Sequence, residues 1–278
     1  MIIDSHHHLW NYDPVTYAWI NDEMALLKRD FLPSEYKFEL DRNGIYGSVV
    51  VQATTTEKET GLLLELSEKS KYILGVVGWV NLLSKDLENK LDAFGDHLKF
   101  KGVRHPIQGE RLGFMTSKDF KLGLSKLKSY DLPYDLLIYP TQLKEATNLV
   151  SEYPNQIFII DHLAKPAIKD RQFQPWQKEI EKIAKYPNVY CKISGMVTEA
   201  KWHRWMIHDF KPYIDIAMEN FGAERVMFGS DWPVCLLSAT YEQVLTILKF
   251  FIRYLSQDEK ENILSRNAIR AYQLNIEM

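Results

Sequence analysis

Short apolar runs rich in β-branched residues recur along the chain, and each is followed by a segment with helical spacing of its apolar positions. Such runs indicate strands buried on both faces, which are typical of a parallel sheet when helices alternate with them. The runs predicted as strands are 2–8, 46–54, 72–80, 98–105, 134–139, 156–162, 188–194 and 225–231.

The helical segments carry start and stop signals. Three of them open with a hydroxyl residue followed three positions later by Glu or Gln, which predicts a capping box. The pairs are Thr56 and Glu59, Thr240 and Gln243, and Ser256 and Glu259. Pro154 and Pro187 each follow a helical stretch and should end it before the next strand.

Eight strand–helix units without a linker, charge block or low-complexity segment predict one α/β domain spanning residues 1–278. A (β/α)₈ barrel accounts best for this order. A doubly wound open sheet is the alternative, although no Gly-rich phosphate loop follows the first strand. Four connections after strands are long: 9–32, which is rich in aromatic residues, 105–117, 163–175 and 195–209. In a barrel these connections gather at the carboxyl ends of the strands, where barrel enzymes keep their active sites.

Composition narrows the class of protein. Hydrophobic residues make up 46% and charged residues 26% of the chain, as in globular proteins with a sizeable core. A net charge of −3 gives no sign of a nucleic-acid or membrane surface, and we expect neither a membrane segment nor a leader peptide. Cys191 and Cys235 are far apart in the sequence, which predicts free thiols and a cytoplasmic protein. A homo-oligomer is left open.

The stretch "DSHHHLW" (4–10) opens the first predicted strand. A purification tag fits poorly, because the histidines follow "MII" directly and precede "LW" without a linker. Since side chains alternate along a strand, Asp4, His6 and His8 are expected on one face. Two imidazoles spaced in this way can converge on one ion or one substrate oxygen. His7 has the opposite parity and should contact a neighbouring strand or helix.

Polar residues also end several later strands. They are Arg104 and His105, Asp161 and His162, Lys192 and Ser194, and Asp231. Each alone has a bland explanation, such as a helix cap or a salt bridge. Together at one barrel mouth they suit the attack of water on a carbonyl group, in which one group polarises the oxygen and another takes the proton.

Several motifs make the chain resemble a known family. The His-x-His pair on the first strand, "KGVRHPIQ" (101–108), "DHLAKP" (161–166), "CKISGM" (191–196) and "FGSDWPVC" (228–235) occur in an order that resembles the amidohydrolase superfamily, and within it the fuconolactonase-like branch of sugar lactonases. The resemblance covers nearly the whole chain. It implies a distorted (β/α)₈ barrel and hydrolysis of a lactone of the fucono-, rhamnono- or galactonolactone type, a small-molecule substrate.

The departures from the superfamily pattern bear on the metal. Members with two metals place Lys or Glu on strand four and a histidine on strand five, whereas this chain has Arg104 and "YDLLIY" there. The resemblance therefore implies one divalent metal, with Zn²⁺ suited to His6, His8, Asp231 and His162. Some lactonases of the superfamily work without metal, so a site that polarises the carbonyl directly is the alternative.

Roles follow for the strand-end residues. Asp231 is expected to deprotonate the attacking water. His162, together with Arg104 and the strand-one histidines or their metal, is expected to stabilise the oxyanion. Lys192, Trp10 and Trp232 are candidates for holding sugar hydroxyls and the ring face. His105, of opposite parity to Arg104, is a candidate substrate contact.

The remaining histidines and the cysteines have plainer explanations. His97 should lie near a helix end, and His203 and His208 on the surface or a lid; Cys191 and Cys235 should be packed thiols. Two other functions stay open. One is metal-dependent decarboxylation of an aromatic acid, and the other is binding of sugar acids without turnover.

Overall fold

The computed structural model describes residues 1–276 and contains an eight-stranded parallel sheet whose strands follow one another in chain order. The strands are β1 (Ile3–His7), β2 (Gly47–Val51), β3 (Ile73–Gly78), β4 (Phe100–His105), β5 (Tyr134–Leu136), β6 (Phe158–Ile160), β7 (Val189–Ile193) and β8 (Val226–Phe228). All eight predicted strands are present, each shorter than its apolar run because the run extends into the adjoining turns.

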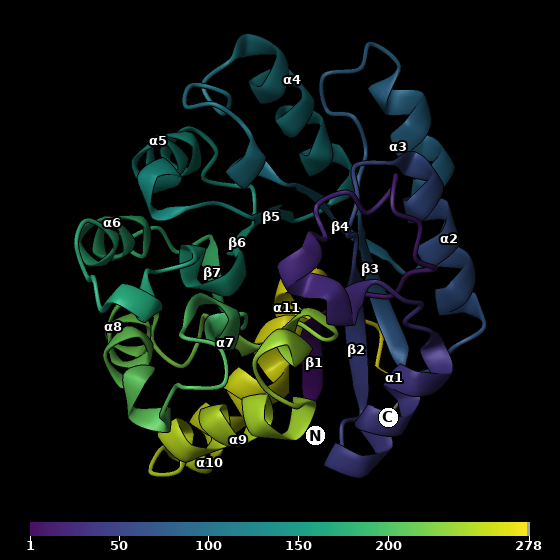
Figure 1. Ribbon diagram of the computed structural model, residues 1–278. Helices are drawn as coiled ribbons and strands as arrows, with labels where there is room; N and C mark the ends of the chain where they lie inside the picture. The colour runs from purple at the N-terminus through teal and green to yellow at the C-terminus, as the bar shows by residue number, and fades with distance from the viewer. Residues whose placement is uncertain (277–278) are drawn as a thin grey trace.

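Helices surround the sheet (Figure 1). They are α1 (Pro33–Asn43), α2 (Glu57–Glu68), α3 (Leu87–Gly95), α4 (Lys118–Leu127), α5 (Leu143–Glu152), α6 (Trp176–Ile183), α7 (Met196–Glu199), α8 (Lys211–Phe221), α9 (Tyr241–Ile252), α10 (Gln257–Glu261) and α11 (Asn267–Tyr272). The predicted (β/α)₈ barrel is confirmed, and the doubly wound alternative is wrong, because the first and last strands meet. None of the helices within residues 1–276 is both long and apolar enough to cross a membrane.

The seam between β1 and β8 nearly closes the barrel. Asp231 N–H donates to His6 O at 2.8 Å, and His8 N–H donates to Trp232 O at 2.7 Å. These bonds lie just beyond the end of β8, so they hold the residues after β8 against the end of β1. The end of β1 and the segment after β8 therefore meet at the face where the strands finish.

A β-bulge in β1 corrects one prediction. The pairing of Asp4 with Ser48 and of His7 with Val50 leaves one extra residue in β1. Asp4 therefore faces outward, where it accepts hydrogen bonds from Tyr36 OH at 2.8 Å and Tyr241 OH at 2.9 Å. The prediction that Asp4 shares a face with the other two residues of the D-x-H-x-H run is wrong, because the bulge reverses the alternation after it.

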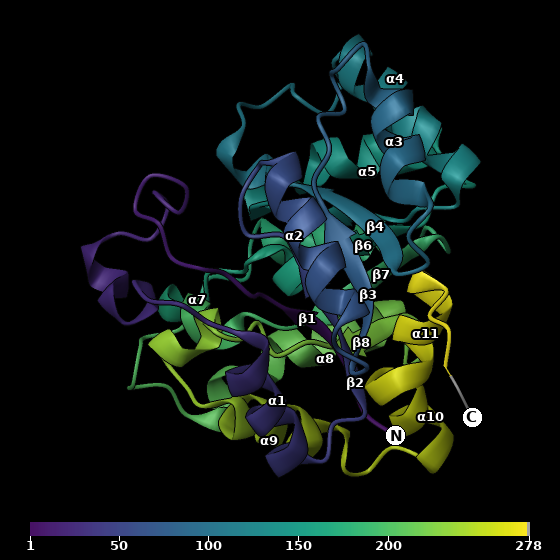
Figure 2. The same ribbon diagram turned by 90° about the vertical axis from the view of Figure 1, so that its right-hand side faces the viewer.

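The barrel interior is apolar at one end and polar at the other. At the amino-terminal end, residues of β1, β2, β3, β6 and β8 pack against residues of α11 and the segment after it. In Figure 2 the segment 9–32, drawn in purple, lies at one end of the barrel, and α11 with the N-terminus lies at the other. The aromatic connection after β1 therefore covers the carboxyl ends of the strands.

Two of the three predicted capping boxes form as expected, at Thr240 with Gln243 and at Ser256 with Glu259. At the start of α2, Thr56 accepts a hydrogen bond from Glu59 N–H, but the Glu59 carboxylate turns to the backbone N–H groups of Ala53 and Thr54. That third box is therefore only half formed, and Glu59 instead fixes the turn after β2.

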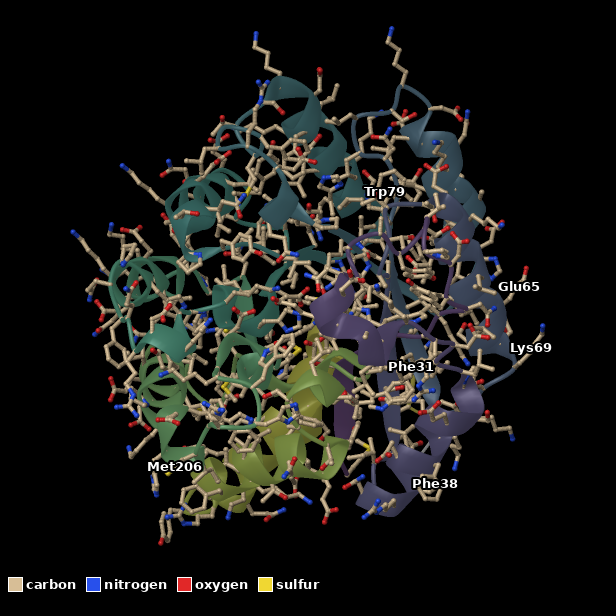
Figure 3. All side chains as sticks on the ribbon, in the orientation of Figure 1. Phe31, Phe38, Glu65, Lys69, Trp79 and Met206 are labelled. Atoms are coloured by element: carbon tan, nitrogen blue, oxygen red, sulfur yellow. The ribbon has the colours of Figure 1, made fainter. Side chains whose placement is uncertain are left out.

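Large apolar side chains on the surface are scattered. Phe38 and Met206, 63% and 64% exposed, lie far apart at the periphery in Figure 3. Glu65 of α2 and Lys69, the residue after this helix, also point away from the barrel there. Isolated exposed apolar residues are ordinary on globular proteins. The chemistry-bearing groups are instead concentrated inside the barrel mouth.

Candidate active site

Two histidines and one carboxylate converge at the carboxyl ends of β1 and β8. The Nε2 atoms of His6 and His8 are 3.3 Å apart, and Asp231 Oδ1 lies 3.4 Å from His8 Nε2 and 3.9 Å from His6 Nε2. The bulge in β1 turns both imidazoles inward, and the β1–β8 seam places the carboxylate between them. His8 and Asp231 keep 6% and 5% of their side chains exposed, so the cluster is reached from the loop side.

His8 is oriented by the neighbouring strand. Its Nδ1–H donates to Val51 O at 2.8 Å, which leaves the lone pair on Nε2 facing Asp231. A backbone carbonyl that fixes the tautomer in this way is the usual support of a metal-binding histidine.

His162 enters the cluster from an uncommon backbone conformation. Residues 162–165 all have positive φ, between 52° and 57°, so the chain makes one left-handed turn directly after β6. This places His162 Nε2 3.9 Å from Asp231 Oδ1 and His162 Nδ1 2.8 Å from Ser194 Oγ. Gly195 lies against the same ring: a Cβ there would be 2.6 Å from His162 Nδ1. Four strained residues are retained where packing over-determines them, which is common at functional sites.

Arg104 reaches the cluster from β4. Its guanidinium donates to Asp161 Oδ2 at 3.0 Å and to Gln52 O, and lies 3.3 Å from His6 Nε2. The side chain is 4% exposed. A fixed positive charge therefore stands beside the imidazole pair in a site that water hardly enters, where its electrostatic effect is strong.

Lys192 lies beneath the cluster with no exposed surface. Its ammonium contacts Asp135 Oδ2 at 2.6 Å, Asp161 Oδ1 at 2.9 Å and His6 Nδ1 at 3.1 Å, and Tyr272 of α11 donates to the same Asp135 oxygen at 2.7 Å. The ammonium is therefore paired within the protein, and the predicted contact of Lys192 with sugar hydroxyls stays a prediction.

Burial and charge set the protonation of these groups. Burial keeps the pKa of His6 well below its ordinary value and lowers the pKa of His162 to about 4, so both imidazoles are neutral near pH 7. For Asp231 burial acts in the opposite direction, but His162 and His8 outweigh it and the pKa of the carboxyl is lowered. Lys192 and His6 likewise hold the pKa of Asp161 well below its usual range. The cluster therefore presents lone pairs and a carboxylate.

The donor set fits one divalent ion. In a tetrahedral Zn²⁺ site with ligands at about 2.0–2.1 Å, neighbouring ligand atoms are about 3.3–3.4 Å apart. The three separations among His6, His8 and Asp231 are 3.3, 3.4 and 3.9 Å, so small side-chain shifts would seat an ion on this triangle. A second group of potential ligands, His6, Asp161 and His162, is also close enough to hold an ion. There, however, Asp161 already faces two cations.

Three predicted substrate contacts lie around the mouth rather than in it. His105 Nδ1 accepts a hydrogen bond from Trp79 Nε1 at 2.9 Å, and its Nε2 lies 2.9 Å from Glu110 Oε1. Trp79 is labelled in Figure 3. Trp10 and Trp232 are each 1% exposed, their rings covered by other aromatic side chains. Contact with substrate from any of the three stays a prediction.

His7 faces outward as expected, stacked on Tyr36 with ring centroids 3.7 Å apart. His97 follows α3, His208 packs edge-on against Phe250 of α9, and both cysteines are buried free thiols.

Sequence reasoning missed Asp135 and Tyr272. Asp135 was visible as the one charge within the apolar run "YDLLIY", and a buried carboxylate requires a cation. Nothing local in the sequence shows that Tyr272, near the end of the chain, would reach the same oxygen.

A cavity of about 890 Å³ lies beside the cluster, between the loops after β5, β6 and β7. Its walls combine aromatic rings with charged and amide groups, among them Tyr139, Lys165, Gln174, Glu199 and Trp202. Aromatic faces with scattered polar groups are typical of pockets for small polar molecules.

The geometry describes a parallel barrel with a His-x-His pair, a later histidine and a strand-eight aspartate at its mouth, and the comparisons with known proteins agree with it. The family model for amidohydrolases matches residues 3–274, and the chain belongs to this amidohydrolase family.

Its relatives include L-fucono-1,5-lactonase of Burkholderia multivorans, 34% identical over 98% of this chain and 96% of the relative. The L-fucono-1,5-lactonase of Burkholderia ambifaria is 30% identical over the same shares. The crystal structure of an amidohydrolase from Burkholderia multivorans with bound zinc superposes with a TM-score of 0.95 at 34% identity, covering 99% of this chain and 100% of that one.

Proposed function

We propose that the protein hydrolyses a small sugar-acid lactone of the fucono-, rhamnono- or galactonolactone type. The observation that carries the proposal is the convergence of His6, His8, His162, Asp231 and Arg104 on one point of the barrel mouth. Both Burkholderia relatives are named as lactonases. This favours lactone hydrolysis over the decarboxylation and the binding without turnover considered above.

The described side chains supply the parts of ester hydrolysis. Water adds to the lactone carbonyl carbon while the Asp231 carboxylate accepts a proton from it, and the carbonyl oxygen becomes an oxyanion. Collapse of this intermediate breaks the ring C–O bond. The leaving alkoxide takes the proton held by Asp231, and the product is an open-chain hydroxy acid.

Arg104 and His162 stabilise the oxyanion. The guanidinium is held by Asp161 and Gln52, so little reorganisation is needed when negative charge develops. Ser194 Oγ–H can donate to His162 Nδ1, which leaves Nε2–H to donate toward the cluster; the opposite tautomer makes Nε2 a ligand. The direction of the hydrogen bond between Ser194 and His162 therefore decides which role His162 takes.

A divalent metal, one Zn²⁺, would be held by His6, His8 and Asp231, with His162 as the fourth candidate. When bound, such an ion polarises a carbonyl oxygen and makes a water molecule more acidic. The neutral imidazoles and the Val51 carbonyl behind His8 are suited to it.

The test is a hydrolysis screen followed with a pH indicator. Initial rates for fucono-, rhamnono- and galactonolactone are compared with those for an acyl-homoserine lactone and an aryl acetate, after subtraction of spontaneous opening. We expect the highest kcat/KM for a sugar lactone, because sites that bind hydroxyls reject analogues lacking them. A non-sugar ester that matched the best sugar lactone would contradict the proposal. Release of CO₂ from an aromatic acid would favour decarboxylation instead.

Location and assembly stay proposals. The two buried free thiols are consistent with a reducing compartment, and we propose a cytoplasmic enzyme. Size-exclusion chromatography with light scattering would decide between a monomer and a homo-oligomer.

A further inference from the structure

The two loops that build the active-site cluster also build one wall of the adjoining cavity. After β6, the left-handed turn directs His162 into the cluster and ends at Lys165, which lines the cavity. After β7, Ser194 contacts His162, and five residues later Glu199 lines the same cavity. The same two loops therefore contribute residues to the cavity and to the cluster. None of His6, His8 and Asp231 lines the cavity.

Lys165 and Glu199 face each other across this wall without satisfying each other. Lys165 Nζ lies 3.6 Å from a Glu199 carboxylate oxygen, longer than the roughly 2.7–2.9 Å of a charge-assisted hydrogen bond. Their side chains are 20% and 24% exposed, and the Lys165 ammonium also lies 5.7 Å from the centre of the Tyr139 ring. Both charged groups therefore keep hydrogen-bonding capacity for a molecule in the cavity.

The pair belongs to the same loops as the cluster, since Lys165 follows His162 by three residues and Glu199 follows Ser194 by five. Burial raises the pKa of Glu199, Asp231 adds to the rise, and Lys165 opposes it.

We propose that Lys165 and Glu199 form a subsite that recognises two neighbouring hydroxyl groups of the lactone, one donating to the Glu199 carboxylate and the other accepting from the Lys165 ammonium. A hydroxyl group can donate or accept a hydrogen bond, so one hydroxyl can donate to the Glu199 carboxylate while its neighbour accepts from the Lys165 ammonium. This inference rests on the proposed function and names the feature of the substrate that this part of the site selects.

A neutral diol fits the pair better than a free carboxylate on the lactone does. The ion pair has no net charge, and an added carboxylate would meet Glu199 and Asp231. Three exposed cations, Lys169, Lys201 and Arg204, also line the cavity. They make a carboxylated lactone the competing ligand that the experiment must include.

The experiment compares Lys165→Met and Glu199→Gln with the wild type on three lactones. These are the best sugar lactone from the screen, δ-valerolactone, which has no hydroxyl group, and a glucarolactone, which carries a free carboxylate. We expect KM for the sugar lactone to rise about 10- to 100-fold in each variant, because a hydrogen bond to a charged group is lost. For δ-valerolactone kcat/KM should change less than about twofold, since it makes no such bond.

Matched controls are Lys121→Met and Glu152→Gln. These residues form an ion pair between α4 and α5 at 2.7 Å, with side chains 24% and 48% exposed. Both controls should keep the wild-type KM for every lactone. Melting curves by circular dichroism verify that all four variants are folded.

Equal losses on the sugar lactone and δ-valerolactone would overturn the subsite, and so would no loss at all or a loss confined to the glucarolactone. If the wild type opened no lactone, the proposed function would fail, and binding would decide the subsite separately. Galactonate would then be titrated into the protein, and its binding would be measured by the change in tryptophan fluorescence. Saturable binding that is weakened in both variants and kept in both controls supports the subsite, and any other result overturns it.

Discussion

Asp161→Asn removes the carboxylate on which the buried charges of the barrel converge. Asp161 lies 2.9 Å from Lys192 Nζ, 3.0 Å from Arg104 and 3.2 Å from His6 Nδ1, and it has no exposed surface. In the wild type, Arg104 and Lys192 are balanced by Asp135 and Asp161. The amide leaves one positive charge uncompensated in a region that water does not reach.

The expected loss of stability follows from this imbalance. Breaking a buried ion pair by removing one partner costs about 3–5 kcal/mol. At about 2.1 cal/mol/K of unfolding entropy per residue, a chain of 278 residues loses about 5–9 °C of Tm for that amount. Because Arg104 and His6 also lose their anchor, kcat/KM should fall about 10²-fold or more.

The assay is thermal unfolding by circular dichroism together with lactone hydrolysis, with Asp41→Asn as the control. Asp41 pairs with Lys37 on the exposed face of α1, where an ion pair contributes little. The double variant Asp161→Asn/Lys192→Met removes one charge of each sign. It should regain part of the lost Tm while staying as inactive as the single variant. A Tm within about 2 °C of wild type for Asp161→Asn, with unchanged kcat/KM, would refute the reasoning.

Three further variants test the cluster. Asp231→Asn should lower kcat about 10²–10⁴-fold without changing the circular dichroism spectrum, because an amide cannot accept the proton of water; more than a tenth of wild-type activity would mean that Asp231 is not the base. Elemental analysis of the purified protein should give about one equivalent of divalent metal, lost in His6→Ala or His8→Ala; two tightly bound equivalents would contradict the single site. Gly195→Ala should lower kcat with only a small change in Tm, since the new methyl group would lie 2.6 Å from His162 Nδ1 and displace this ring. A wild-type kcat would show that the loop accommodates the methyl group without moving His162.

Much of the fold could be predicted because its signals are local. An apolar run rich in valine such as "GSVVV" favours a buried strand, and Ser256 with Glu259 caps a helix using groups three residues apart. The order of strands and helices then leaves few architectures, because parallel strands need crossover connections. The polar strand ends also pointed to the barrel mouth, since every parallel strand finishes at the same face.

The arrangement of the site depended on contacts between distant parts of the chain. The bulge in β1, which turns Asp4 toward Tyr36 and Tyr241, arises from pairing with β2 and not from the residues of β1 alone. Lys192 is two residues before Ser194, which contacts His162, so alternation along the strand would place both at the mouth. Asp135 and Asp161 instead hold the Lys192 ammonium beneath the cluster.

The left-handed turn at residues 162–165 is likewise invisible in the sequence, which contains no glycine there to announce a positive φ. Packing from other elements holds it, including the hydrogen bond from Trp176 Nε1 to Leu163 O at 2.6 Å. The sequence by itself thus determined which elements form and at which face the chemistry gathers, because hydrophobic periodicity and capping act over a few residues. Tertiary structure alone decided the distances among these groups and brought Asp135 and Tyr272 to Lys192, because buried charges take the positions where partners from other elements balance them.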